Sequence, residues 1–450
     1  MPESEGRITR RSILKAGGAA AVATLLPASL GFAAGPRRAR RRYAIVGTGG
    51  RGSSMWGASV LAKHGDAIEL VGLCDVNRKR AELVQRRLGA SCPVFTDFDR
   101  MCDETKPDLL TVTTVDATHS DYIVRGLGRG IDVITEKPMV TDEAQCRAVL
   151  EAEKKSGRKL TVAFNYRFAP KHVTIKETLL SGAIGEVKSV DFAWYLDVHH
   201  GADYFRRWHR LRKNSGSLLV HKATHHFDLV NWWLDSGPAD VAAFGSLRHY
   251  GKNGTFRHTN CRGCPHQAKC PYFWDMTKDR GSMELYADCE SEDGYLRDGC
   301  VFREDVDIFD TMNLAVRYAN GVQMSYSLNA CMPFEGYRLA FNGTLGRLEV
   351  RDHERQPWKP DAETEIFLTR NFGAREAVKV GPTIIGQGGG GHGGGDDVLR
   401  ALVFAPTPVP DHLRLPDSRA GARSCLTGIA ARKSIDEGRV VRIEELVAGL

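Results

Sequence analysis

Short apolar runs alternate with amphipathic segments over the first third of the chain. Four runs have the continuous apolar pattern of buried parallel strands, at residues 43–46, 68–74, 108–114 and 131–135. The segment 78–88 between two of them repeats its apolar residues at helical spacing. This alternation predicts an α/β fold that begins with a doubly wound parallel sheet and binds its ligand at the carboxyl ends of the strands.

The pattern changes after about residue 165. Residues 187–196 and 305–350 alternate apolar and polar positions, with glycine turns in the second stretch, which predicts an antiparallel meander. We therefore expect a C-terminal α+β domain with a large, open, mostly antiparallel sheet. The expected boundaries are a nucleotide domain at 43–165, a substrate and oligomerisation domain at 166–417 with a Cys-rich insertion at 255–303, and a final helix at 418–450 that packs back on the nucleotide domain.

The first apolar run ends in a glycine-rich turn with the spacing G-x-G-x-x-G. This order of strand, glycines and helix is typical of a Rossmann-type dinucleotide site, where glycines permit a tight turn and a close approach of the backbone to the pyrophosphate. The second run ends in Asp75, whose carboxylate could accept hydrogen bonds from the ribose hydroxyls and would repel a 2′-phosphate. The site is thus expected to prefer NAD, although Asn77, Arg78 and Lys79 leave NADP open. The residues expected to hold the cofactor in this turn are Gly47, Gly49, Gly50, Arg51 and Gly52.

Three further motifs carry a resemblance to a known family. They are the tripeptide Glu136-Lys137-Pro138 at a strand end, the strand-end Thr114 shortly before His119, and the segment 165–168, Asn-Tyr-Arg-Phe. Together with the glycine turn, they make nearly all of the chain resemble the glucose-fructose oxidoreductase, inositol dehydrogenase and MocA (Gfo/Idh/MocA) family. The resemblance implies that Thr114, His119, Glu136 and Lys137 lie beside the nicotinamide.

Lys137 is the expected proton acceptor. Removal of a hydride from a secondary alcohol requires loss of the hydroxyl proton, and a lysine beside a positive nicotinamide would have a lowered pKa suited to that task. The family resemblance implies the same role, because its lysine binds the reacting hydroxyl.

A helical stretch at 216–234 contains the next group of candidates. Helical spacing predicts that His221, His225 and Asp228 share one face. The resemblance makes His225 an acid/base or positioning residue, but His221 replaces the aspartate usual in the family, so the usual proton relay is in doubt, and Lys222 is a further candidate donor. A histidine that only packs in the helix is the alternative for both imidazoles.

The substrate is expected to contact side chains from three places in the chain. Beside Asp228, the candidates are Tyr166 and Arg167, and His392 and Asp396 from the glycine-rich stretch 386–397. That stretch could be a flexible linker, but Asp396 suits the N-cap of a following helix, which favours a structured loop.

The insertion has its own chemistry. Cys261, Cys264 and Cys270 have C-x2-C-x5-C spacing, and Cys300 is the expected fourth thiolate. Such a set could hold one structural zinc or an iron–sulfur cluster. Disulfides are the alternative, since the chain is expected to be exported.

Residues 1–33 are expected to be a twin-arginine signal peptide. Arg10 and Arg11 precede a mildly apolar stretch and small residues, and the stretch is too short and too weakly apolar for a stable membrane anchor. We thus expect a periplasmic or otherwise exported protein that meets the twin-arginine translocase. Five arginines at 37–42, in a basic linker at 34–42, supply most of the formal net charge of +7. The rest of the chain is near neutral, which argues against nucleic-acid binding.

The motifs favour an exported NAD(P)-dependent oxidoreductase acting on a hydroxyl of a sugar or glycoside. Because no appreciable nicotinamide pool exists outside the cytoplasm, the cofactor should stay bound and be reset within each cycle. A glycoside hydrolase using transient oxidation and elimination is the alternative, with His392 and Asp396 as extra acid/base groups. A non-catalytic sugar or nucleotide sensor is the second alternative. The resemblance also implies a homo-oligomer paired through the open sheet.

Overall fold

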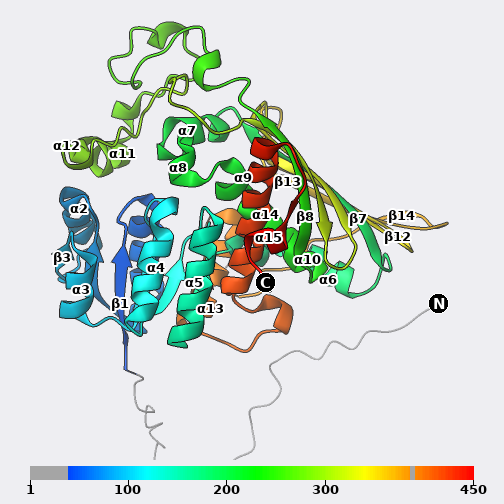
Figure 1. The fold of residues 1–450 in the computed structure, drawn as a ribbon, viewed down its shortest axis with the longest axis horizontal. Helices are drawn as coiled ribbons and strands as arrows, with labels where there is room; N and C mark the ends of the chain where they lie inside the picture. The colour runs from blue at the N-terminus through cyan, green and yellow to red at the C-terminus, as the bar shows by residue number, and fades with distance from the viewer. Residues whose placement is uncertain (1–38, 386–390, 450) are drawn as a thin grey trace, which may run out of the picture. The chain divides into compact units, whose positions relative to one another are not determined.

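The computed structural model describes residues 39–385 and 391–449. The expected signal peptide lies outside the described residues, as do residues 386–390 of the glycine-rich stretch. A six-stranded parallel sheet in the order β3-β2-β1-β4-β5-β6 forms the N-terminal half (Figure 1). Its strands are β1 (Arg41–Val46), β2 (Ile68–Cys74), β3 (Val94–Phe95), β4 (Leu109–Val112), β5 (Asp132–Thr135) and β6 (Leu160–Val162). This strand order is that of a dinucleotide-binding sheet, so the predicted doubly wound fold is confirmed.

Local sequence signals set the ends of the helices that connect these strands. They are α1 (Ser59–His64), α2 (Arg78–Leu88), α3 (Phe98–Thr105), α4 (His119–Gly128) and α5 (Glu143–Ser156), and a π-helical turn at Gly52–Ala58 leads into α1. The side chains of Asn77, Asp97 and Asp142 cap α2, α3 and α5 by accepting from backbone N–H groups in the first turn. Gly89 and Gly157 end α2 and α5 in the left-handed conformation.

A nine-stranded, mostly antiparallel sheet forms the second half, in the order β14-β13-β12-β11-β7-β10-β9-β8-β15. Its strands are β7 (Val187–Asp197), β8 (Pro238–Ser246), β9 (Thr311–Tyr318), β10 (Gln323–Met332), β11 (Glu335–Gly343), β12 (Gly346–Arg355), β13 (Glu363–Arg370), β14 (Arg375–Ala377) and β15 (Val441–Arg442). The expected sheet is thus confirmed, but the expected continuous meander is wrong. Strand β7 lies between β10 and β11, parallel to β10 and antiparallel to β11.

One face of this sheet is covered by helices and the other is open. Along β9, every second residue is buried, as the alternating sequence predicts. The remaining helices are α6 (Pro170–Leu180), α7 (His200–Arg206), α8 (Arg212–Ser215), α9 (Leu218–His221), α10 (Ala223–Leu234), α11 (Arg280–Leu285), α12 (Glu290–Asp293), α13 (Gly395–Phe404), α14 (Ser418–Glu437) and α15 (Ile443–Leu446). Helices α10 and α14 lie between the two sheets (Figure 1).

Two late helices join the halves of the chain. Apolar residues of α13, among them Val398 and Leu399, pack in the same core as Tyr43 and Ile45 of β1. Helix α14 contacts β8 and α10 on one side and α5 and β6 on the other. Residues 40–450 consequently form one compact unit in which both sheets share a continuous core.

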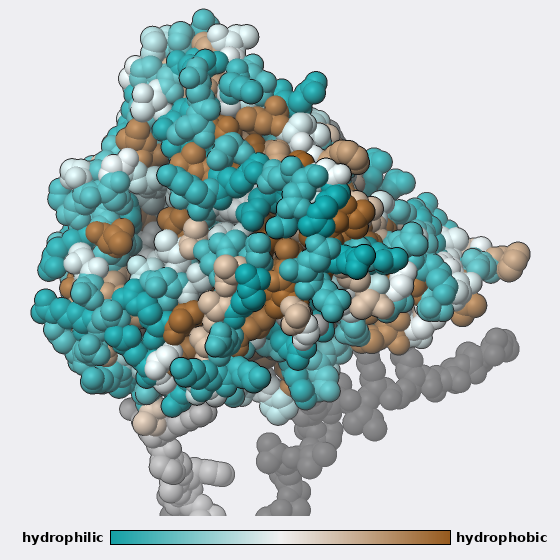
Figure 2. Space-filling model, in the orientation of Figure 1, coloured by the Kyte–Doolittle hydropathy of each residue, from teal (hydrophilic) through white to brown (hydrophobic). Residues whose placement is uncertain are grey.

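The surface is predominantly polar on the face shown in Figure 2, with apolar residues in scattered patches. Within the described ranges, no helix is both long and apolar enough to cross a membrane.

Candidate active site

The glycine turn has the backbone geometry that a dinucleotide needs. Gly47 has a positive φ of 91°, and a Cβ on Gly52 would lie 2.0 Å from the Gly47 carbonyl oxygen. Side chains are therefore excluded at both positions. A Cβ on Gly49 or Gly50 would meet only the Tyr286 hydroxyl within 4 Å, so these two residues leave an open cradle in front of the helix N-terminus. The residues present thus fit a pyrophosphate held by backbone N–H groups.

Asp75 lies at the carboxyl end of β2, beside this turn. Its carboxylate accepts from the Thr48 backbone N–H at 2.7 Å and from the Thr48 hydroxyl at 2.8 Å. The Asn77 backbone N–H donates to the other oxygen at 2.9 Å. These bonds fix the carboxylate next to the glycine turn, where its free acceptor positions could take ribose hydroxyls.

Lys137 follows β5, is half-buried, and leads into a polar chain whose other members, His221 and Asp116, are buried. Its Nζ donates to the His221 carbonyl oxygen at 3.1 Å and lies 3.4 Å from Nε2 of the same residue. The other ring nitrogen, Nδ1, lies 2.5 Å from an Asp116 carboxylate oxygen. Burial lowers the pKa of Lys137 to about 8, although the nearby Asp116 and Glu136 oppose that shift. The arrangement gives a lysine that can accept a proton near neutral pH and pass it toward His221.

Asp116 and His209 belong to this cluster and were not among the predicted site residues. Asp116, His209 and His221 are, in the described part of the chain, the one group of three metal-capable side chains whose ligand atoms all lie within 4.8 Å. The His209 ring packs at 4.1 Å between centroids against His221, and its buried Nδ1 has no partner in the described residues. Because the Lys137 ammonium already places a positive charge beside the group, we interpret it as a proton relay and not as a cation site. In the sequence, only two features point to Asp116 and His209 as site residues. Asp116 follows the strand β4, and His209 lies in the polar loop 199–214.

His225 lies in the first turn of α10, four residues after His221. Its ring is buried and stacks on Tyr166 with centroids 4.2 Å apart, and its Nδ1 has no hydrogen-bond partner in residues 39–385 and 391–449. Lys222 donates to the Tyr166 hydroxyl at 3.1 Å. Burial lowers the pKa of both His225 and Lys222, which keeps the imidazole neutral. His225 therefore has a free ring nitrogen that a substrate hydroxyl could satisfy.

The expected single helical face at 216–234 is interrupted. The chain forms α9 and α10 with Lys222 between them, so His221 approaches Lys137 while His225 approaches Tyr166. Asp228, one turn further on, makes a two-pronged ion pair with Arg167 at 2.7 and 2.5 Å. Both groups are buried, and contact of Asp228 or Arg167 with the substrate stays a prediction.

Arg51 connects the glycine turn to the late glycine-rich segment. It donates to Glu136 at 2.7 Å and to Asp396 at 3.1 Å, and Glu136 also accepts from the Trp56 indole N–H at 2.9 Å. His392 Nδ1 lies 3.3 Å from an Asp396 oxygen, and the His392 ring centroid lies 5.9 Å from that of His225. Burial alone would raise the pKa of Asp396, but hydrogen bonding to His392 and the Arg51 charge hold it below its ordinary value. The late segment thus reaches the same site as Lys137 and His225.

His119 and Thr114 brace the loop after β4. The His119 ring nitrogens lie 2.8 Å from the Pro138 carbonyl oxygen and 3.1 Å from that of Thr114. Since both nitrogens face backbone carbonyls, this imidazole links the loop to the residue after Lys137. Thr114 accepts a 2.8 Å hydrogen bond from Thr118. A direct contact of either residue with the cofactor stays a prediction.

Four of the five cysteines of the insertion, all except Cys289, lie near one another. A bridge between Asn260 and Gly299 brings the chain at Cys261 beside the chain at Cys300. Burial raises the pKa of Cys270, and the neighbouring Cys261, Cys300 and Cys264 thiols raise it further. All cysteines in the described ranges are free thiols, and the Arg206 guanidinium donates to the Cys261 sulfur at 3.1 Å. No three of the described cysteine sulfurs come within 4.8 Å of one another, whereas a tetrahedral zinc site places its sulfurs about 3.8 Å apart.

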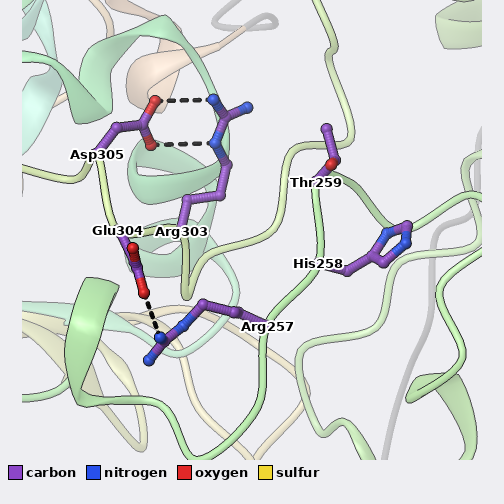
Figure 3. A pocket seen from close by; sticks show the side chains of 6 residues that line it. All are labelled: Arg257, His258, Thr259, Arg303, Glu304 and Asp305. Carbon is purple, nitrogen blue, oxygen red and sulfur yellow. Dashed lines mark hydrogen bonds and ion pairs between the residues drawn. The ribbon is translucent and has the colours of Figure 1, made fainter.

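A surface hollow of about 510 Å³ lies on the insertion beside the cysteines, where the Cys300 backbone N–H donates to the Thr259 carbonyl oxygen (Figure 3). It is lined by Arg257, His258, Thr259, Arg303, Glu304 and Asp305. Its arginines are already paired, Arg257 with Glu304 and Arg303 with Asp305, and none of the predicted site residues lines it. We therefore place the site at Lys137 and not in this hollow.

A dinucleotide sheet with an acid after its second strand and a buried lysine relay after β5 defines a nicotinamide-dependent oxidoreductase. The chain belongs to the Gfo/Idh/MocA oxidoreductase family. The model of the family's NAD-binding Rossmann fold matches residues 41–164, and the model of its C-terminal alpha/beta domain matches residues 176–443.

Individual relatives agree with this assignment. The chain is 39% identical over 426 residues to YteT of Bacillus subtilis, which is named an oxidoreductase on a provisional basis, and the match covers 90% of this chain and 98% of YteT. It is 29% identical to the inositol 2-dehydrogenase of Rubrobacter xylanophilus, over 45% of this chain and 54% of that enzyme.

Two solved structures share the fold at low sequence identity. The aldose-aldose oxidoreductase of Caulobacter crescentus, complexed with glycerol, has a TM-score of 0.60 at 17% identity, covering 90% of this chain and 100% of that one. The WlbA dehydrogenase of Bordetella pertussis, in complex with NADH and UDP-GlcNAcA, has a TM-score of 0.61 at 18% identity, covering 90% of this chain and 99% of that one.

Proposed function

We propose that this oxidoreductase removes a hydride from a secondary hydroxyl of a sugar or glycoside, with Lys137 as the proton acceptor. The observation that carries the proposal is the chain from half-buried Lys137 to buried His221 and Asp116, in which the lysine has a pKa of about 8. NAD supplies the hydride acceptor when bound. The names of the relatives, inositol 2-dehydrogenase and aldose-aldose oxidoreductase, favour a polyhydroxylated substrate.

Four side chains of the site, those of Lys137, His221, His225 and Tyr166, would each have a separate role in this reaction. Neutral Lys137 takes the proton of the reacting hydroxyl at Nζ while the hydride leaves the adjacent carbon. The proton then has a path to His221, whose Nδ1 is fixed by Asp116. His225 offers its free ring nitrogen to a neighbouring hydroxyl, and Tyr166 holds the imidazole by stacking.

The test is turnover on a panel of aldoses, inositols and glycosides by the parent protein and Lys137→Met. We expect the variant to lose about a thousandfold in kcat while it still binds cofactor. Normal ligand binding by the variant, together with no turnover of any panel member by the parent, would instead support the sugar or nucleotide sensor.

We further propose that the cofactor stays bound and that each cycle is redox-neutral, because the hydride taken from one sugar is returned either to a second sugar or to the ketone of the same glycoside after its cleavage and hydration. This follows from the twin-arginine motif at Arg10 and Arg11, because export would remove the protein from the cytoplasmic nicotinamide pool. Purified protein should carry NAD, and turnover should need no added cofactor. Protein isolated without NAD that releases NADH in proportion to sugar oxidised would contradict this proposal.

Export itself has a direct test. Replacement of Arg10 and Arg11 by lysine keeps the charge but removes the paired guanidinium groups of the motif. We expect the altered precursor to stay in the cytoplasm while the parent reaches the periplasm, as measured by cell fractionation. Equal export of both would exclude the twin-arginine route.

Redox-neutral glycoside cleavage is the second candidate function. The His392–Asp396 pair lies next to His225 and could supply the acid/base group that elimination beside a new ketone requires. Release of an aglycone from a nitrophenyl glycoside, abolished in both Lys137→Met and His392→Ala, would favour it. Oxidation of free sugar without cleavage of any glycoside would favour the dehydrogenase.

We also propose one structural metal, zinc or an iron–sulfur cluster, at Cys261, Cys264, Cys270 and Cys300. The gathering of four free thiols and the N–H donor from Arg206 to Cys261 support it. The sulfurs would have to move inward to close a tetrahedral site. Elemental analysis of cytoplasmically folded protein should find one zinc or an iron cluster per chain, and disulfides among these cysteines would contradict the assignment.

A further inference from the structure

The Cys-rich insertion reaches back to the nucleotide half at the glycine turn. The Gly50 backbone N–H donates to the Tyr286 hydroxyl at 3.0 Å. This N–H group belongs to the cradle in which a pyrophosphate oxygen would accept. A side chain from the second half of the chain, 236 residues away in sequence, therefore occupies the acceptor position of a phosphate oxygen.

A row of polar contacts holds the insertion along α2. Arg87 pairs with Glu284 at 2.6 Å, Arg80 pairs with Asp293 at 2.7 Å, and the Asn77 amide donates to the Cys289 carbonyl oxygen at 2.8 Å. Helices α11 and α12 lie next to α2 in Figure 1. Because α2 starts directly after Asp75, the insertion borders the expected path of the cofactor from its ribose to its pyrophosphate.

Tyr286 is positioned by its surroundings. Its neighbour Leu285 is buried in the core of the nucleotide half, with Val84 of α2. The Arg80 and Arg297 guanidinium groups lie 5.6 and 6.0 Å from the Tyr286 ring centroid, and Tyr295 packs edge-on at 5.8 Å. The hydroxyl is thus held over the glycine turn by groups on both halves of the chain.

We infer that the insertion forms the second wall of the dinucleotide site, with Tyr286 as a cofactor-binding residue that slows cofactor release. When a pyrophosphate oxygen accepts from Gly50, the Tyr286 hydroxyl can turn and donate to the same phosphate group. A phenol can do so because it is both donor and acceptor. The contacts along α2 must open before the cofactor can leave past the insertion.

The inference rests on cofactor binding and not on the proposed sugar chemistry, so the two can fail separately. The experiment measures release of NADH from the loaded full-length protein, without sugar, by nicotinamide fluorescence after a chase with excess NAD. We expect Tyr286→Phe to speed release about tenfold, because a hydrogen bond to a charged group is lost. The matched control is Tyr272→Phe, which removes a hydroxyl of the same insertion that bonds His249 instead.

A second variant tests the wall independently of the tyrosine. Glu284→Gln weakens the contact with Arg87 of α2 and should also speed release, by about threefold, with an unchanged melting temperature. Release rates within twofold of the parent in both variants would overturn the inference. Slower release from Tyr286→Phe would also overturn it, because the tyrosine would then compete with the pyrophosphate.

Discussion

The protonation state of Lys137 should determine how kcat/KM depends on pH. Its neutral form is the proton acceptor, and burial lowers its pKa to about 8. We predict that kcat/KM rises about tenfold per pH unit below that value and levels off above it, since the fraction of neutral lysine rises in that way. A pH–rate profile of the parent checks this, and a flat profile between about pH 6 and pH 9 would exclude Lys137 as the base.

The Arg167–Asp228 pair is a second residue-level feature with a measurable consequence. Because both groups are buried, Asp228→Asn should leave an unpaired guanidinium and lower the free energy of unfolding by about 3–5 kcal/mol. Replacement of both, by Arg167→Met with Asp228→Leu, should recover most of that loss. Urea denaturation of the single and double variants measures the coupling, and additive losses would show that the pair does not act as a unit.

Residues differ in how far sequence could place them. The glycine turn, Asp75 and Lys137 could be located because each follows a strand with a clear apolar pattern and the strand ends of a parallel sheet meet. Asp116 and His209 could not be located in the same way, since their meeting with His221 depends on packing between a loop of the first sheet and a loop of the second half. The pairing of Asp228 with Arg167 could not be predicted either, because the two residues are 61 positions apart in sequence.

For helices and strands, the sequence predicts the type of an element better than its neighbours in the fold. Helix α14 spans residues 418–437 between the caps Asp417 and Gly438, so the final helix is shorter than the expected range 418–450, and β15 and α15 follow it. The insertion of β7 between β10 and β11 could not be read from the meander pattern, because alternation shows which face of a strand is buried but not which strand lies next to it.

Gly428 in α14 provides a prediction at this scale. A Cβ there would lie 2.2 Å from the Leu219 carbonyl oxygen, so the helix can approach α9 only with glycine at this position. Alanine would gain about 1 kcal/mol in helix propensity, but the backbone clash outweighs it. We expect Gly428→Ala to lower the free energy of unfolding by about 2 kcal/mol, measured by urea denaturation.

The control for Gly428→Ala lies in the same helix. Arg419 is exposed near the start of α14, and Arg419→Ala should change stability by less than about 0.5 kcal/mol. Equal effects of the two substitutions would mean that the close approach of α14 to α9 does not limit stability.

At the scale of the whole molecule, the uncovered face of the nine-stranded sheet is the expected contact between subunits. It carries a hollow of about 440 Å³ lined by side chains of both signs, including Asp191, Arg347 and Glu349. We predict a homo-oligomer in light scattering, because such a polar, shaped face can pair with a second copy. Ala193→Arg, in the middle of the face, should shift the mass toward the monomer, and a parent that is already monomeric would contradict the prediction.

The position of α14 also determines when the chain can finish folding. Its buried residues contact β6 of the first sheet and β8 of the second, both of which precede it in the chain. During synthesis, the apolar surface that α14 covers on each half stays exposed until the segment ending at Glu437 has left the ribosome. A stop codon before Ser418 would leave that surface uncovered on both halves.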